Sequence, residues 1–516
     1  KAFVPQEYWS ITATLQNSHG AFEAELAKRN GETLDRLAIG NEAAAQAIVK
    51  DLEKSTYKIA ALESKEVRKH PAAPFTTSTL QQTAAKRLGL SSKKTMFLAQ
   101  QLYENGHITY MRTDSVNLSQ EALDAAATWI KQNLPGDYAL EGPRRFKNTS
   151  RLAQEAHEAI RPTQAHVTPD QLSASKDEQR LYELIWRRFI ASQMPPAVLN
   201  AVHIDVEART DGANTYILTA NGSTMKFDGF LKVWPVKFEE KDLPHLAKDD
   251  ALKATAITPA QHFTEPPPRY NEASLIKTLE QYGIGRPSTY APTIAVILAR
   301  NYVERQQGRF FPTEIGMLVN KVLTENFPEI VDVDFTAKME NELDDIAEGK
   351  EGWQKVIRDF YTPFAEHLAV KYEEVKKDDI VPPEVTDQIC DKCGKPMVVK
   401  FGRFGKFLAC SGFPDCKNTK TLKEAPKSSG VKCPKCLANE DRKNDPGELL
   451  ERRVRAGRAR GKLFWGCSKY PACDFAVWND PVQAPPTWSP EDDAKKAERN
   501  LQRATRGKKK AATKEE

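Results

Sequence analysis

The stretch that decides most about the fold is CDKCGKPMVVKFGRFGKFLACSGFPDC, which runs from Cys390 to Cys416. It holds a C-x2-C pair followed by a C-x5-C pair, and the same two pairs recur between Cys433 and Cys473. Each C-x2-C turn offers two thiolates at once, and two pairs complete a tetrahedral zinc site. Buried or disulfide-bonded cysteines are the alternative. We predict two structural zinc sites, with the ligands Cys390, Cys393, Cys410 and Cys416, and Cys433, Cys436, Cys467 and Cys473.

Aromatic and basic side chains alternate around these cysteines, a mixture that suits stacking on single-stranded bases next to phosphates. A module this small also needs aromatic side chains for its own core, so we expect about half of them to pack inside it. The candidates for base contact are Phe407, Phe413, Trp465 and Tyr470. Basic runs at 452–462 and 495–514 indicate nucleic-acid-binding arms, with a solvated tail as the alternative.

The composition indicates a folded chain of several domains. It has 516 residues, 75 Lys+Arg against 70 Asp+Glu, and 40% hydrophobic residues. No run of 18 apolar residues occurs, which excludes a membrane-spanning helix. No cysteine precedes Cys390, as expected for a reducing compartment. The chain starts at Lys1 with neither Met nor an apolar leader, so we expect a piece of a longer protein.

Hydrophobic periodicity and turn residues predict a mixed α+β chain upstream of the cysteines. The expected elements are a helix over 41–70, two helices over 78–104 with a turn at 89–92, an extended segment over 107–113, a helix over 120–132 capped by Ser119, strands over 198–236, and a helix–turn–helix over 271–300 followed by a β-wing over 302–312. A winged helix is a common shape for docking on DNA, and also a common scaffold without that role.

The segment ITYMRTDS, residues 108–115, holds a candidate nucleophile. On an extended strand Tyr110 and Arg112 face the same side. A phenol oxygen can attack phosphorus, and a guanidinium can stabilise the negative charge of the transition state. The spacing alone fits a packed tyrosine equally well.

The amino-acid sequences of five segments indicate which protein family the chain resembles. They are YMRTDS at 110–115, EAHEAIRPT at 155–163, YGIGRPSTY at 282–290, FTAKME at 335–340, and the tandem cysteine quartets. In this order they resemble the type IA DNA topoisomerases, and most closely the bacterial topoisomerase I branch. The resemblance covers nearly the whole chain.

The resemblance implies a multi-domain α+β gate with winged-helix elements, a β-rich hinge arch and two zinc ribbons. The implied parts are an arch from 1–70 and 197–265, an inserted helical domain at 71–196, a helical base at 266–375, a linker at 376–387, ribbons at 388–424 and 430–480, and a basic tail at 481–516. The insertion would swing on the arch so that a second strand passes.

The resemblance also implies residue roles. Tyr110 would cut one DNA strand and keep its 5′ phosphate as a phosphotyrosine, so that resealing needs no ATP. Arg112 would bind the scissile phosphate, and His157 would handle phosphate charge or a proton. His157 and Arg161 would share a face if that segment is helical. The residues expected to bind DNA are Arg161, Arg286, Ser288, Thr289 and Arg300.

One part of the family pattern is missing. The magnesium-binding Toprim domain should precede Lys1, and Asp332-Val-Asp334 reads as structural and not as its metal site. We therefore expect a fragment that binds single-stranded DNA but relaxes supercoils poorly alone, with magnesium in the absent domain.

A non-catalytic single-stranded DNA-binding protein and a decatenating topoisomerase III-like enzyme are the alternatives. We further expect a cytoplasmic, nucleoid-associated monomer without a membrane partner that acts on negatively supercoiled DNA. The resemblance adds RNA polymerase as a partner.

Overall fold

The computed structural model describes residues 3–147, 157–210, 212, 214–375, 384–402, 405–421, 427–454 and 462–494. The basic tail at 495–514 and most of the basic run at 452–462 lie outside these ranges. The chain divides into two compact units, Lys1–Ile380 and Val381–Glu516, which are described one at a time. In the described part, no helix is both long and apolar enough to cross a bilayer.

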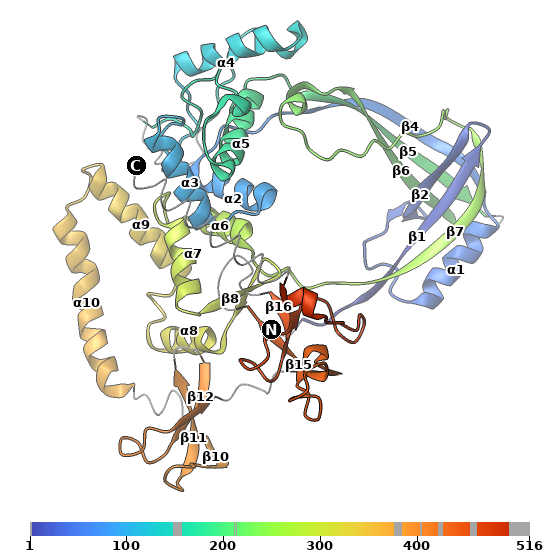
Figure 1. Cartoon of the computed structure of the whole chain (residues 1–516). Coiled ribbons are helices and arrows are strands. Elements are labelled where there is room, and N and C mark those ends of the chain that lie inside the picture. Colours follow the sequence, from blue (N-terminus) through green and yellow to red (C-terminus); the bar gives the residue numbers. More distant parts are fainter. Residues whose placement is uncertain are drawn as a thin grey trace. The chain divides into compact units, whose positions relative to one another are not determined.

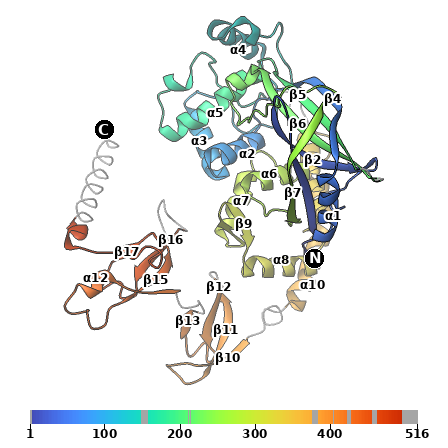
Figure 2. The ribbon, with the colours of Figure 1, turned by 90° about the vertical axis from the view of Figure 1, so that its right-hand side faces the viewer.

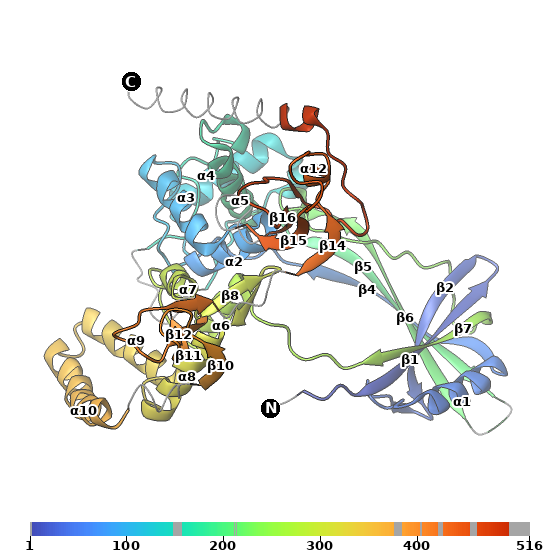
Figure 3. The same cartoon turned by 60° about the horizontal axis from the view of Figure 1, so that its bottom comes forward.

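A seven-stranded antiparallel sheet forms one part of the first unit (Figure 1). Its strands are β1 (Glu7–Asn17), β2 (Gly20–Arg29), β3 (Glu32–Thr33), β4 (Thr56–Lys69), β5 (Ala197–Arg209), β6 (Thr215–Phe227) and β7 (Ala251–Phe263), in the order β1-β7-β4-β5-β6-β2-β3. Because β1 also pairs with β2, the sheet closes on itself. The helix α1 (Glu42–Glu53) packs beside β7 and β1 (Figure 3) and buries Ile48 and Leu52 in the sheet's core.

The helix predicted over 41–70 is wrong in its second half. Residues 56–69 form β4, which pairs with β5 from Thr56↔Arg209 to Lys69↔Ala197. Tyr57 and Ile59 alternate with exposed neighbours and are buried under the sheet. Near-helical spacing of a few apolar residues could not reveal this pairing, because the partner strand lies about 140 residues away in sequence.

Among the described residues between β4 and β5, the helices are α2 (Thr77–Leu88), α3 (Ser92–Glu104), α4 (Gln120–Asn133) and α5 (Lys176–Ser192), with short 3-10 turns at Gly136–Tyr138 and Pro169–Gln171. The two helices over 78–104 and the helix capped by Ser119 are confirmed. These helices share one core, which also takes in Phe230 and Trp234. The strands predicted over 198–236 do not continue through 230–234, because Gly229–Lys232 is a 3-10 turn that buries Phe230, and Val233 directly after it is also buried.

The winged-helix prediction is confirmed. The helices α6 (Glu272–Gln281) and α7 (Tyr290–Ala299) are joined by a turn in which Gly283 and Gly285 have positive φ, and the strands β8 (Val303–Gln306) and β9 (Arg309–Pro312) form the wing. Three helices follow, α8 (Glu314–Asn326), α9 (Val333–Ala347) and α10 (Trp353–Glu374). Asp332 caps α9 by accepting the amides of Asp334 and Phe335, which agrees with its structural reading.

The second unit holds two small four-stranded sheets (Figure 2). The first consists of β10 (Glu384–Ile389), β11 (Pro396–Gly402), β12 (Gly405–Cys410) and β13 (Thr419–Thr421). The second consists of β14 (Ser428–Lys432), β15 (Glu448–Arg453), β16 (Leu463–Cys467) and β17 (Ala476–Val477), with the single-turn helix α12 (Pro434–Leu437) after β14. Cysteines lie at the centre of both cores.

Candidate active site and zinc centres

The segment that carries Tyr110 is held from beneath by the start of α2. The buried Thr77 hydroxyl donates to the carbonyl oxygens of Met111 and Thr113 at 2.7 and 3.1 Å, and it accepts the Thr113 amide at 2.9 Å. Ile108 and Met111 point into the core, whereas Tyr110 is 41% exposed. Among the described residues, the isolated bridge Ile108↔Pro162 is the β pairing that this segment makes, and its other residues are bends or irregular backbone, so it is not a regular strand.

Tyr110 opens into a cleft of about 280 Å³. The cleft is lined by Tyr110, Arg112, Thr113, Asp114, His157, Arg286, Pro287, Ser288 and Asp344. The structure thus brings together five side chains that the sequence proposed separately: the candidate catalytic three, Arg286 and Ser288. The ring of Tyr103 meets that of Tyr110 edge-on, with the centroids 5.2 Å apart, which limits the orientation of the phenol.

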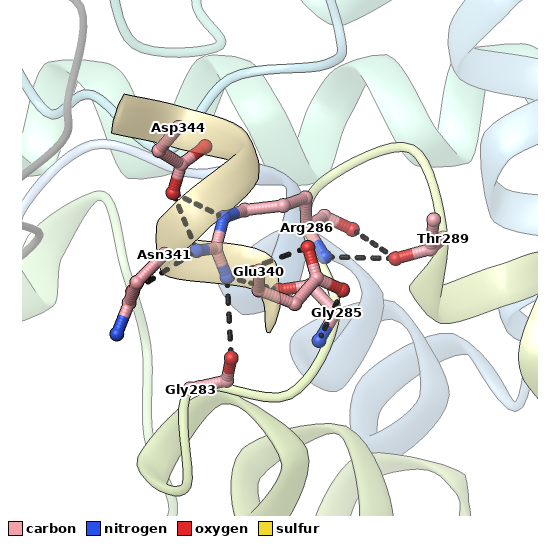
Figure 4. A network of polar contacts seen from close by, with 7 residues as sticks. All are labelled: Gly283, Gly285, Arg286, Thr289, Glu340, Asn341 and Asp344. Carbon is pink, nitrogen blue, oxygen red and sulfur yellow. Dashed lines mark hydrogen bonds and ion pairs between the residues drawn. The ribbon is translucent and has the colours of Figure 1, made fainter. Parts of the chain in front are cut away.

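The far wall of the cleft is the turn between α6 and α7, and Figure 4 shows what holds it. Asp344 on α9 accepts from Arg286 Nε and Nη2 at 3.1 and 2.5 Å, and Glu340 accepts the Gly285 amide at 3.1 Å. Thr289 Oγ1 accepts the Arg286 amide, which closes the turn. Burial lowers the pKa of Arg286, but Asp344 and Glu340 outweigh that effect and raise it overall. Arg286 therefore keeps its positive charge at neutral pH.

Three residues expected to bind DNA do not line this cleft. Arg161 pairs with Glu158 at 2.7 Å, and its side chain is 13% exposed. Thr289 uses its hydroxyl within the turn, and Arg300 lies exposed at the end of α7, over the ring of Tyr302. Their contacts with DNA stay predictions.

The condition under which His157 and Arg161 would share a face, a helix over residues 157–161, is not met in the structure. The segment is extended, because the amides of Ala159 and Ile160 donate to the carbonyl oxygens of Asn117 and Phe75. His157 still lines the cleft, since the segment passes beside residues 109–117. Residues 155 and 156 of that motif lie outside the described ranges.

Each cysteine quartet has the geometry of a zinc site. Within each quartet the sulfur atoms all lie within 4.8 Å of one another, and none is in a disulfide. Tetrahedral Zn–S bonds of about 2.3 Å place two sulfurs about 3.8 Å apart. The sulfur–sulfur distances in the structure are 3.7 Å for Cys390–Cys416, 3.2 Å for Cys393–Cys410, 3.8 Å for Cys433–Cys473 and 3.6 Å for Cys436–Cys467. The quartets therefore fit zinc, whose role when bound is to crosslink each small sheet.

Backbone amides complete both centres in the same way. The amides of Gly412 and Lys469 donate to Cys410 Sγ and Cys467 Sγ at 3.3 and 3.4 Å, two positions after the cysteine in each case. Such donors stabilise thiolates and orient them toward a metal. The internal repeat seen in the sequence is thus a repeat of the metal site itself.

The candidate aromatic side chains divide into two groups. Phe413 and Tyr470 occupy equivalent positions, three residues after Cys410 and Cys467, and are 61% and 62% exposed. A cation lies over each ring, Lys400 over Phe413 at 5.6 Å and Arg452 over Tyr470 at 5.7 Å. Trp465 packs against the second cysteine core, and Phe407 is half-buried on β12.

Sequence reasoning missed Asp344 and Glu340. The signal was present, because FTAKME ends at Glu340 and Asp344 is one helical turn further along α9. The motif was interpreted as a family marker, and nothing local to it reveals a partner 58 positions away.

Comparison with known proteins agrees with this fold and these sites. A family model described as DNA topoisomerase matches residues 1–358, and one described as topoisomerase DNA binding C4 zinc finger matches residues 387–425 and 430–482. Full-length topoisomerase I from Thermotoga maritima is similar, with 34% sequence identity and a TM-score of 0.62, over 82% of this chain and 67% of that chain. A DNA-acting isomerase is the class that these matches define. The chain belongs to the DNA topoisomerase family, as a bacterial type IA topoisomerase I.

Proposed function

We propose that this chain relaxes negatively supercoiled DNA by transient cleavage of one strand through Tyr110. The phenol oxygen of Tyr110 attacks a backbone phosphorus and forms a 5′-phosphotyrosine. The bond from phosphorus to the 3′ oxygen breaks, the phenol gives up its proton, and the leaving 3′ oxygen gains one. Religation reverses these steps and needs no ATP, because the phosphotyrosine conserves the phosphodiester bond. The observation that carries the proposal is the exposed Tyr110 in one cleft with Arg112 and His157.

The remaining cleft residues are assigned by charge and position. Arg112 is exposed two residues after Tyr110 and suits the scissile phosphate, whose transition state carries extra negative charge. His157 is placed to balance that charge or to move the proton. Ser288, exposed on the opposite wall, suits a neighbouring phosphate oxygen. Among the described residues, the groups suited to a metal are the cysteine quartets, so magnesium stays an expectation and no step here uses it.

We include in the proposal that residues 71–196 swing as a unit while they hold the cut strand, together with residues 230–234, which share their core. Both ends of this segment join the sheet at adjacent strands, because Lys69 at the end of β4 pairs with Ala197 at the start of β5. Because the chain leaves and re-enters the sheet at paired residues, the segment can rotate without breaking the pairing between β4 and β5. RNA polymerase as a partner and the monomeric state also remain predictions.

The test is a covalent trap. The full chain, with and without a separately expressed Toprim domain, is mixed with labelled single-stranded DNA and denatured in detergent. We expect a trapped complex in wild type, none with Tyr110→Phe, and a normal amount with the matched control Tyr103→Phe. A complex that survives Tyr110→Phe rejects the nucleophile. Failure of wild type in both arms supports the non-catalytic DNA-binding alternative.

A further inference from the structure

The guanidinium of Arg286 has no free donor in this structure. Its five N–H groups all have protein acceptors: Nε and Nη2 donate to Asp344, Nη2 also to Asn341, and Nη1 to the carbonyl oxygens of Gly283 and Gly285 at 3.2 and 3.0 Å. A DNA phosphate cannot be held by Arg286 until one of these acceptors leaves. Asp344 is the hydrogen-bonded acceptor among them that carries a full negative charge, and Glu340 adds a second carboxylate oxygen 3.8 Å from Nη1.

The two carboxylates on α9 imitate an anion bound to the turn. Glu340 and Asp344 are four residues apart on one helical face. Glu340 accepts a backbone amide, that of Gly285, and a single oxygen of Asp344, Oδ2, accepts from both Nε and Nη2 of Arg286 (Figure 4). Backbone amides of a turn and an arginine fork are also the donors that proteins present to phosphate oxygens.

Asp344 is placed so that a bound strand would meet it. It lines the same cleft as Tyr110 and Arg112, so a phosphate near Arg286 is repelled by its charge. The side chains of Arg286 and Asp344 are 24% and 26% exposed, so either partner can turn to water when the pair separates. Exchange therefore leaves no charge buried and alone.

We propose that Asp344 occupies the place of a DNA phosphate on Arg286 and is exchanged for a phosphate of the bound strand. Glu340 keeps the turn in shape during the exchange through the Gly285 amide. The inference rests on the proposed function for its ligand, single-stranded DNA. It adds to that function a competitor for the phosphate within the protein itself. The Asp344 carboxylate neutralises the Arg286 guanidinium and fixes its orientation when no DNA is bound.

The test measures binding of a fluorescent single-stranded oligonucleotide to the full chain at about 50 mM salt, where phosphate contacts are strong. Asp344→Asn keeps the shape and one acceptor but removes the competing charge. We expect its binding to be about three- to tenfold tighter than wild type. The matched control is Asp345→Asn, which makes the same charge change beside it on a residue that pairs with Lys350. We expect less than about a twofold change there.

A double-mutant cycle then assigns the effect to Arg286. In an Arg286→Gln background, Asp344→Asn should improve binding no more than Asp345→Asn does. Equal effects of the two substitutions in the wild-type background, or weaker binding by a folded Asp344→Asn protein, overturn the proposal. Thermal melting establishes that each variant is folded. Binding of DNA does not require its cleavage, so the double-mutant cycle can be interpreted even if no covalent complex forms at Tyr110. The failure of one proposal can therefore be distinguished from the failure of the other.

Discussion

At the scale of single residues, the pair Glu158–Arg161 makes the Tyr110 region sensitive to acid. Burial would raise the pKa of Glu158, but hydrogen bonds from Arg161 and the Ser119 amide, with the charge of Arg161, lower it overall. A carboxyl whose pKa is lowered by folding stabilises the protein above its unfolded pKa of about 4.3 and loses that contribution as the pH falls through the folded value.

We expect Glu158→Gln to lower the free energy of unfolding by about 2 kcal/mol at neutral pH. The deficit should shrink as the pH falls below about 4, because the wild type then loses the same charge. Urea unfolding of both proteins, followed by tryptophan fluorescence across this range, measures the difference. A deficit that stays constant or grows in acid would show that the charge of Glu158 is not what stabilises this segment.

Short contiguous motifs name candidate site residues, and the roles of these residues stay predictions. The motifs predict Tyr110, Arg112 and His157 as catalytic residues, and the three line one cleft although residues 157–161 are not helical. Asp344 is not predicted from its motif, because its role depends on Arg286, a partner far away in sequence. A motif shows which residues are neighbours in sequence, whereas the fold determines which distant carboxylate contacts them.

At the scale of elements, the predictions depended on how local each element's determinants are. The helix α4 was found through its cap Ser119, and the zinc ribbons through cysteine spacing, both of which are local signals. The strand β4 was mistaken for helix, because its stability comes from pairing with β5 and β7. Its alternation at Tyr57 and Ile59 was visible but too short to outweigh the preceding helix.

The equivalence of the two ribbons predicts that Phe413 and Tyr470 each stack on a base of single-stranded DNA. Stacking on an aromatic ring is worth about 1–3 kcal/mol per base, so we expect Phe413→Ala and Tyr470→Ala each to weaken binding by about tenfold. Both rings are exposed, so neither ribbon should lose its fold. Oligonucleotide titration of the full chain measures this.

The matched control for that titration is Leu437→Ala, a substitution of a half-exposed apolar side chain without a π face in the second ribbon. It should leave affinity unchanged. If Leu437→Ala weakens binding as much as Tyr470→Ala, the contact is general apolar burial and not stacking. If neither aromatic substitution has an effect, the exposed rings do not face the strand.

At the scale of the first unit, the helical insertion is tied to the winged helix by polar contacts. Glu272, 6% exposed at the start of α6, accepts both the amide and the hydroxyl of Ser92 at the start of α3 and pairs with Arg305 of the wing. Glu280 accepts from Ser78 and Gln82 of α2. The proposed swing must break these contacts, whereas the strands β4 and β5 stay joined.

We therefore expect Glu272→Gln to make the start of α3 open more often, because a neutral amide in this buried position no longer pairs with Arg305 and accepts less strongly from Ser92. Hydrogen exchange should speed up about tenfold in peptides covering 92–99 and 303–306, and stay unchanged in β5 and α4. Glu280→Gln, an equal charge change at an exposed site, should affect α2 alone and less strongly. If hydrogen exchange accelerates in the sheet and the helices alike, Glu272 stabilises the whole unit and does not specifically hold the helical insertion to the winged helix. If nothing changes, the insertion is held to the winged helix by its apolar contacts, and the opening step must be sought elsewhere.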